Sequence, residues 1–75
     1  MVKIGDKVEL ARDVERYPQF IAKKGLQGTV IKQDSEVFAV KMDKQLTGAE
    51  EWDNCIEWYS TDGSFDDIPK DLTVL

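Results

Sequence analysis

Residues 28–42, GTVIKQDSEVFAVKM, decide the fold that we predict for this chain. In the second half of this stretch Phe38, Val40 and Met42 occupy every other position, the spacing that puts alternate side chains on one face of a β-strand. Residues 28–33 form a comparable run with β-branched side chains, and the polar residues between the two runs favour a tight connection. The stretch therefore predicts two strands joined by a short turn.

The same alternation recurs outward from this pair, at residues 7–12, 54–59 and 72–75. Five short strands joined mostly by loops predict an all-β fold, a small five-stranded antiparallel barrel that closes on itself. Closure would remove the exposed strand edges that invite aggregation. The side chains expected to fill the interior are Val8, Leu10, Val30, Phe38, Val40, Met42, Ile56, Trp58, Leu72 and Val74.

Long connections separate these strands. Residues 13–25 have a partly helical spacing of apolar side chains, but Pro18 removes a backbone donor, so we expect a loop there with at most one helical turn near 13–17. A turn of helix is also predicted around 48–53. The segment IPKD, residues 68–71, predicts one short helical turn before the last strand.

The chain has 75 residues and is expected to form one domain, 1–75. A domain of this size has a small core, and the single cysteine and the absence of histidine exclude an internal disulfide and a Cys/His metal site as additional stabilisation. Self-association into a homo-oligomer is therefore a reasonable expectation. No cofactor is predicted.

The sequence has no apolar run near the ~20 residues that cross a bilayer, and no signal-peptide pattern at its start. Together with the unpaired cysteine, this predicts a cytoplasmic protein that does not enter a membrane.

Charge is distributed unevenly along the chain. Residues 1–33 carry seven Lys/Arg against four acids, a net of +3, whereas residues 34–75 carry three against eleven, a net of −8. The total of −5 disfavours binding to a phosphate backbone by the chain as a whole. A local basic patch in the first half stays open, although solvated faces of opposite sign are the simpler interpretation.

The order of elements resembles that of the SH3-like barrel. The resemblance rests on IGDKVEL, a long first loop, KKGLQGTVI, FAVKMD, IEWY, and IPKD leading into LTVL. Within this superfamily the glycine-and-valine pattern of the first two strands is similar to KOW domains. The size resembles small bacterial and plastid barrels, such as the variable chain of ferredoxin–thioredoxin reductase and the barrel portion of nitrile hydratase's beta subunit.

This resemblance implies mainly a non-enzymatic, accessory or docking role, because most such barrels serve that purpose. The KOW similarity implies a second hypothesis, an RNA-binding or ribosome-associated domain, although such domains are typically basic. A third hypothesis is an oligomeric enzyme with its active site at a subunit interface, because the plasmid-borne dihydrofolate reductase is also a small SH3-like chain. No motif of that reductase's active site is found in this sequence. One fold hosts many functions, so the residues have to discriminate among these hypotheses.

Aromatic residues in two loops are the best candidates for a partner-binding surface. Tyr17 and Phe20 lie in the first long loop and Trp52 lies in the second, next to acids that would complement a cationic or proline-containing peptide. For Phe20 the stronger interpretation is that it closes the barrel, together with Ile21, as a small satellite core. The predicted partner-binding residues are Tyr17, Phe20, Glu50, Glu51, Trp52 and Asp53.

The nucleic-acid hypothesis depends on a basic cluster near the KOW-like glycines. Its residues are Arg16, Lys23, Lys24 and Lys32. Four positive charges would give modest, salt-sensitive contact with a phosphate backbone.

Neither a metal site nor a catalytic site is predicted. Asp62, Asp66 and Asp67 lack the alternate spacing and distant glutamate of a calcium loop, and more simply cap the turn that follows. Cys55 has no histidine to act as its base, so it is expected to pack near the sheet as a small apolar group. The acids from Glu50 to Glu57 are expected to form a solvated face rather than an acid–base pair.

Overall fold

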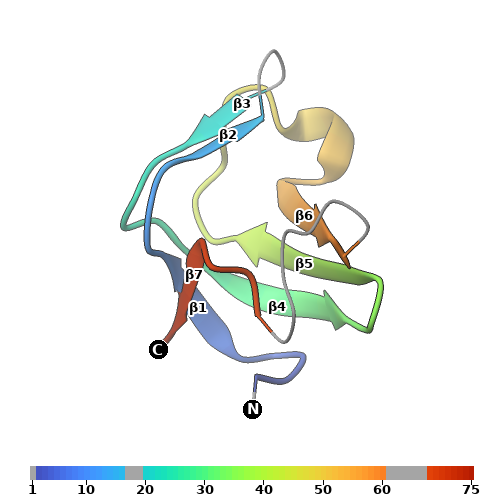
Figure 1. Ribbon diagram of the computed structural model, residues 1–75. Coiled ribbons are helices and arrows are strands. Elements are labelled where there is room, and N and C mark those ends of the chain that lie inside the picture. The colour runs from blue at the N-terminus through green and yellow to red at the C-terminus, as the bar shows by residue number, and fades with distance from the viewer. Residues whose placement is uncertain (1, 17–19, 61–67) are drawn as a thin grey trace.

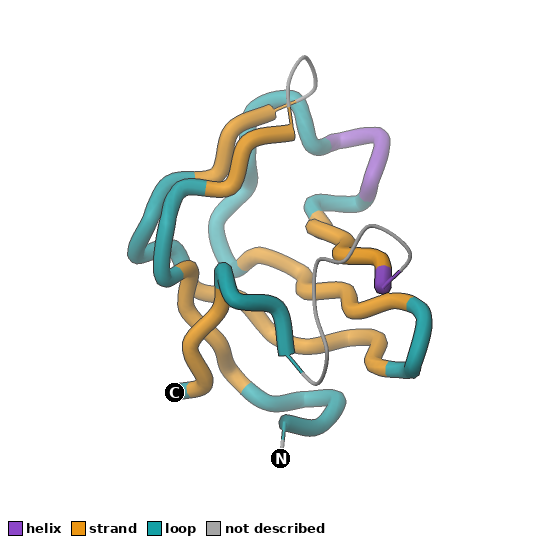
Figure 2. The backbone as a smooth tube through the Cα atoms, viewed as in Figure 1, coloured by secondary structure: helices purple, strands orange, loops and turns teal. Residues whose placement is uncertain are grey.

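The computed structural model describes residues 2–16, 20–60 and 68–75, with the side chains of Arg16 and Glu51 outside the described part. It consists mostly of short β-strands and includes the 3-10 turn η1 (Glu50–Trp52) (Figures 1 and 2). The strands are β1 (Lys7–Leu10), β2 (Val14–Arg16), β3 (Phe20–Ala22), β4 (Gln27–Gln33), β5 (Val37–Met42), β6 (Cys55–Tyr59) and β7 (Leu72–Val74).

Five of the strands form one antiparallel sheet in the order β6-β5-β4-β1-β7. These are the five strands that the alternating pattern predicts, so the all-β class and the antiparallel sheet are confirmed. The remaining two strands, β2 and β3, pair with each other as a separate two-stranded sheet.

The pair β4–β5 forms the middle of the large sheet. Its register shifts between Val30 and Lys32, which leaves Ile31 as an extra residue that is half exposed. The connection between the strands is built on Asp34, whose carboxylate accepts hydrogen bonds from the backbone N–H groups of Glu36 and Val37, both at 2.8 Å. The predicted tight turn is therefore held by a side chain that imitates a backbone acceptor.

The core contains the predicted interior residues, with one exception. Trp58 and Phe38 are fully buried and meet edge to face, with ring centroids 6.4 Å apart. Val74 was expected inside but is 45% exposed, although it pairs with buried Val8. The reason is its place on an edge strand near the end of the ladder, where one side of β7 faces solvent.

The first long loop was predicted incorrectly. Residues within 13–25 form the hairpin β2–β3 rather than a loop with a helical turn near 13–17. Phe20 and Ala22 are buried and Ile21 is 48% exposed, because side chains alternate across a strand. Phe20 thus takes the predicted inward position, whereas the prediction that Ile21 packs beside it is wrong.

The short helical turns were predicted in part. A turn of helix does form at η1, within the expected residues 48–53. At 68–71 the backbone makes a hydrogen-bonded turn instead of helix, with the Leu72 N–H donating to the Pro69 carbonyl at 3.0 Å. The chain leaves this turn at once because the Asp71 carbonyl accepts from the Ala11 N–H and Leu72 then pairs with Leu10 on β1.

The two edges of the large sheet are linked by a side chain. The indole Nε1–H of Trp58, on edge strand β6, donates to the Asp71 carboxylate at 3.0 Å, immediately before edge strand β7. Asp71 also lies 3.4 Å from the Arg12 guanidinium. The sheet therefore curves far enough for residues at or beside its opposite edges to form a hydrogen bond.

The part of the chain that the structure describes contains no helix with the length and apolar character of a membrane span.

Candidate functional site

The hairpin β2–β3 and the turn η1 meet through two aromatic rings. Phe20 on β3 and Trp52 at the end of η1 make an edge-to-face contact, with centroids 6.2 Å apart and planes at 61°. Phe20 is 8% exposed whereas Trp52 is 37% exposed. Figure 1 shows the hairpin at one end of the molecule. The pair therefore consists of a covered ring that supports an open one.

Buried apolar side chains connect the turn that carries Trp52 to the core. Leu46 and Ala49 are buried in the core cluster. The Ala49 carbonyl accepts hydrogen bonds from the N–H groups of both Trp52, at 3.1 Å, and Asn54, at 3.0 Å. The turn is short, but its backbone is tied to a buried residue.

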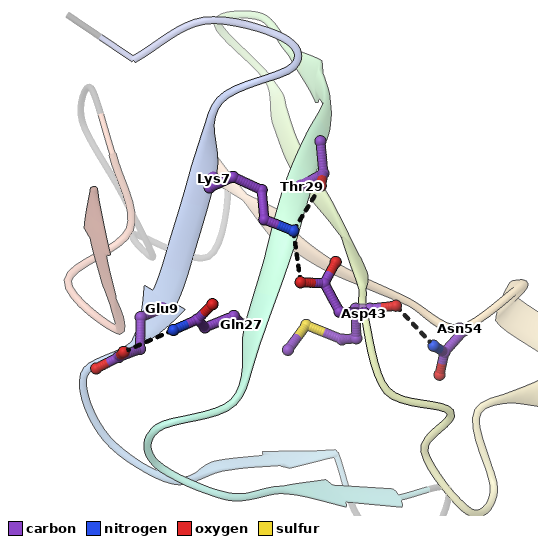
Figure 3. Close-up of polar contacts among 7 residues, drawn as sticks. Lys7, Glu9, Gln27, Thr29, Asp43 and Asn54 are labelled. Carbon is purple, nitrogen blue, oxygen red and sulfur yellow. Dashed lines mark hydrogen bonds and ion pairs between the residues drawn. The ribbon is translucent and has the colours of Figure 1, made fainter. Parts of the chain in front are cut away.

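Asn54 is the buried polar residue of this region, with 7% of its surface exposed. Its side-chain oxygen accepts from the Leu46 N–H at 2.8 Å, and its Nδ2 donates to the carbonyls of Met42 at 2.9 Å and Lys44 at 3.1 Å. Figure 3 shows the amide nitrogen of Asn54 directed toward the strand that ends at Met42. Both N–H groups of the amide therefore have an acceptor, and its oxygen has a donor.

The acids around Trp52 are exposed. The Asp53 side chain is 89% exposed and its carboxylate lies 3.8 Å from the Lys41 ammonium, an ion pair at the limit of direct contact. Glu50 is exposed and has no ion-pair partner within the described residues. Surface pairs with this geometry contribute little, so both carboxylates keep their charge available to a partner.

The structure brings part of the predicted partner-binding set together. Phe20 and Trp52 are in contact, and Glu50 and Asp53 flank Trp52 on the same turn. Tyr17 lies outside the described residues, as does the side chain of Glu51.

The structure does not bring the lysines of the predicted basic cluster together. Lys23 and Lys24 lie in the turn before β4, and Lys32 lies near the far end of that seven-residue strand, about 17 Å from its first residue at the usual rise of a strand. Lys23 also lies 3.8 Å from the Asp13 carboxylate. The side chain of Arg16 is outside the described part. These lysines therefore form separate charges rather than one patch.

A second group of polar side chains crosses strands β1 and β4 (Figure 3). Lys7 donates to Asp43 at 2.5 Å and to Thr29 at 3.4 Å, and Gln27 donates to Glu9 at 3.3 Å. These groups are exposed, and Lys7 lies directly opposite Thr29 in the ladder. They are cross-strand pairs of a solvated face, with no buried group suited to acid–base chemistry.

Cys55 has the features of an unreactive thiol. Burial, and after it the Asp53 carboxylate, raises the pKa of Cys55 above its ordinary value, with Lys41 acting in the opposite direction. Its Sγ lies 3.3 Å from the Asp53 carbonyl. Within the described residues no three His, Cys, Asp or Glu side chains are grouped to hold a metal ion. The acids Asp62, Asp66 and Asp67 lie outside those residues.

Sequence reasoning missed two residues that build this end of the molecule. One is Asn54, which organises the turn of Trp52, and the other is Asp71, which binds the Trp58 indole. The dipeptide of Asp53 and Asn54 is a turn signal, since both residue types tolerate the left-handed backbone region. Nothing in the local pattern signals that Asn54 is buried, because its partners are distant in the chain.

Comparison of the chain with models of known protein families, with curated proteins and with solved structures returned no match.

Proposed function

We propose that this chain is a small SH3-like barrel that docks a protein or peptide through the surface around Trp52. The barrel is supported by the strand order of the sheet and by the Trp58–Asp71 bond, which links the regions of its two edges. The long connections are then the elements free to bind a partner, as in many small barrels.

The exposed indole of Trp52 is the observation that carries the docking proposal. A tryptophan that is 37% exposed yet held against a buried phenylalanine offers a large ring at low cost in conformational entropy. Tryptophan is among the residues most enriched at the centres of protein interfaces. Ile31 and Tyr59 are similarly exposed, but they lie on the strands of the large sheet rather than on a turn flanked by Glu50 and Asp53.

The charge around Trp52 favours a partner segment with positive charge. Glu50 and Asp53 flank the ring on the same turn, and only Asp53 has a cation near it within the described residues. Complementary charge of this kind mainly increases the rate of association and its dependence on salt. The proposal assigns the chain no catalytic step, and it places the protein in the cytoplasm as a binding module.

Selection of peptides from a random display library on the intact protein tests this proposal. Peptides that bind should lose affinity by about 2 kcal/mol, roughly 30-fold, on the Trp52→Ala variant if the ring is a central anchor. The matched control is Ile31→Ala, which removes a comparably exposed apolar side chain from β4 and should leave the affinity unchanged. If the selected peptides bind wild type and Trp52→Ala equally well, the proposal that Trp52 forms the docking surface is wrong.

A further inference from the structure

Two successive residues after Trp52 have left-handed backbone conformations. Asp53 has φ of 54° and Asn54 has φ of 61°, and in the described part of the chain these are the non-glycine residues with positive φ. Such conformations are sterically unfavourable for residues with a Cβ atom, and they persist where the surrounding structure imposes them. Specific interactions must therefore hold Asp53 and Asn54 in these conformations, directly after the proposed docking residue Trp52.

The side chain of Asn54 supplies those interactions. It lies immediately before β6, and its three hydrogen bonds reach Met42 at the end of β5 and Lys44 and Leu46 in the following loop. Its backbone adds two more links, because its carbonyl accepts from the Met42 N–H and its N–H donates to Ala49. One residue therefore fastens both ends of the connection between β5 and β6.

Trp52 shares a hydrogen-bond acceptor with this network. The carbonyl oxygen of Ala49 accepts from the N–H groups of both Trp52 and Asn54, so a shift of either residue disturbs the bond of the other. The indole of Trp52 in turn contacts Phe20, which belongs to the separate two-stranded sheet β2–β3. The orientation of Trp52 therefore depends on where Asn54 holds the turn.

We propose that Asn54 is a positioning residue for Trp52 and that its carboxamide sets the orientation of the docking ring. This inference rests on the proposed function for its biological meaning, but the position of the ring can be measured without any partner. Buried polar networks of this kind specify one arrangement of the groups they join, provided that every member is satisfied.

Three substitutions separate the role of the carboxamide from that of the backbone. Asn54→Gly removes the side chain but accommodates the positive φ, whereas Asn54→Ala removes the side chain and keeps the strain. Asn54→Asp keeps an acceptor for the Leu46 N–H and loses both donated bonds. If the carboxamide positions Trp52, the Gly and Ala variants displace the ring alike although Gly is the more stable, and Asp has an intermediate effect.

Fluorine NMR of protein labelled with 5-fluorotryptophan reports the ring directly. The chain has two tryptophans, so two resonances are expected, and Trp52→Phe assigns them. In Asn54→Gly and Asn54→Ala the Trp52 resonance should shift and the Trp58 resonance should stay in place. Ile56→Val is the matched control, because it removes a methyl group from the buried side of β6 and lowers stability without touching the turn.

Affinity for a Trp52-dependent peptide from the display selection is the second readout. It should fall by about tenfold in Asn54→Gly, as expected for a displaced anchor, and stay within about twofold of wild type in Ile56→Val. A Trp52 resonance that does not move in either the Gly or the Ala variant overturns the inference, whatever the peptides do. A resonance that moves while no Trp52-dependent peptide can be selected supports the positioning role and contradicts the proposed function instead.

Discussion

The rings of Phe20 and Trp52 meet edge to face with their centroids 6.2 Å apart, and this contact joins the hairpin β2–β3 to the turn η1. The two residues are far apart in the chain and belong to elements that share no strand ladder. The contact is therefore a tertiary interaction that can be measured separately from the stability of either element.

A double-mutant cycle with Phe20→Leu and Trp52→Leu should show this coupling. Edge-to-face aromatic pairs contribute about 0.5–1.5 kcal/mol beyond the burial of their surface, so the double variant should lose less free energy of unfolding than the two single variants together. Urea unfolding of the four proteins measures this difference. The control cycle combines Phe20→Leu with Ile31→Ala on β4 and should be additive, and equal coupling in both cycles would show that the ring contact is not its source.

Gly28→Ala should be more destabilising than Gly5→Ala or Gly25→Ala. A Cβ atom at this position would lie 2.6 Å from Val40 Cγ1 and 2.7 Å from the Lys41 carbonyl oxygen, where β4 and β5 pair. Overpacking of this kind costs about 1–3 kcal/mol or more, because backbone has to move. Chemical denaturation provides the measurement.

Gly25→Ala is the comparison for that substitution. A Cβ atom there meets nothing within 4 Å, but φ is +94°, so only conformational strain of about 1 kcal/mol is expected. The losses from Gly28→Ala and from Val40→Ala should be less than additive, because a smaller side chain at the buried residue 40 relieves one close approach while the Lys41 carbonyl stays in place. Equal losses for Gly25→Ala and Gly28→Ala would contradict the close approach of β4 and β5.

Asp71→Ala should destabilise the protein by about 1–3 kcal/mol, because it removes the acceptor of a buried indole N–H. Asp71→Asn keeps an acceptor for Trp58 and should cost less. Arg12→Ala removes only the exposed ion pair of Asp71 and should cost no more than about 1 kcal/mol. Urea unfolding ranks the three variants by their free energy of unfolding. If Arg12→Ala were the most destabilising, the Arg12–Asp71 ion pair would be more important than the Trp58–Asp71 hydrogen bond, which would contradict this prediction.

Asp34 should make the stability of the protein depend on pH in the acid range. Hydrogen bonds from the backbone N–H groups of Glu36 and Val37 lower the pKa of Asp34 below its ordinary value of 3.8. A lowered pKa in the folded state means that the contribution is present above the pKa of the unfolded chain and is lost as pH falls through the folded value.

The comparison of wild type with Asp34→Asn measures that contribution. The difference in unfolding free energy should be constant from neutral pH down to about pH 5, since the unfolded carboxyl titrates near 3.8, and should shrink below it. Glu36→Gln, which changes a neighbouring charge but keeps the backbone donor, should not reproduce this profile. A difference that grows on acidification would contradict the lowered pKa.

Local sequence determined the strands of the large sheet and most of its core. The alternation around Phe38, Val40, Ile56 and Trp58 favours strands that direct these side chains to one face, because a shift of one residue would turn all of them to the opposite face. The turn at Asp34 is equally local, since its bonds reach only three residues along the chain. These features could be predicted because their causes lie within a few residues of each other.

The hairpin β2–β3 and the turn of Trp52 were decided by tertiary structure. Strands of three residues are too short for their alternation to be distinguished from a helical spacing, so the pairing that joins Val14 to Ala22 settled the conformation of β2 and β3. The burial of Asn54 depends on carbonyls and an N–H group 8 to 12 residues away. Contacts between such distant groups form only when the whole sheet assembles. For that reason the sequence alone indicated aromatic residues in the loops, whereas the tertiary structure determined that Phe20 is buried and Trp52 is exposed.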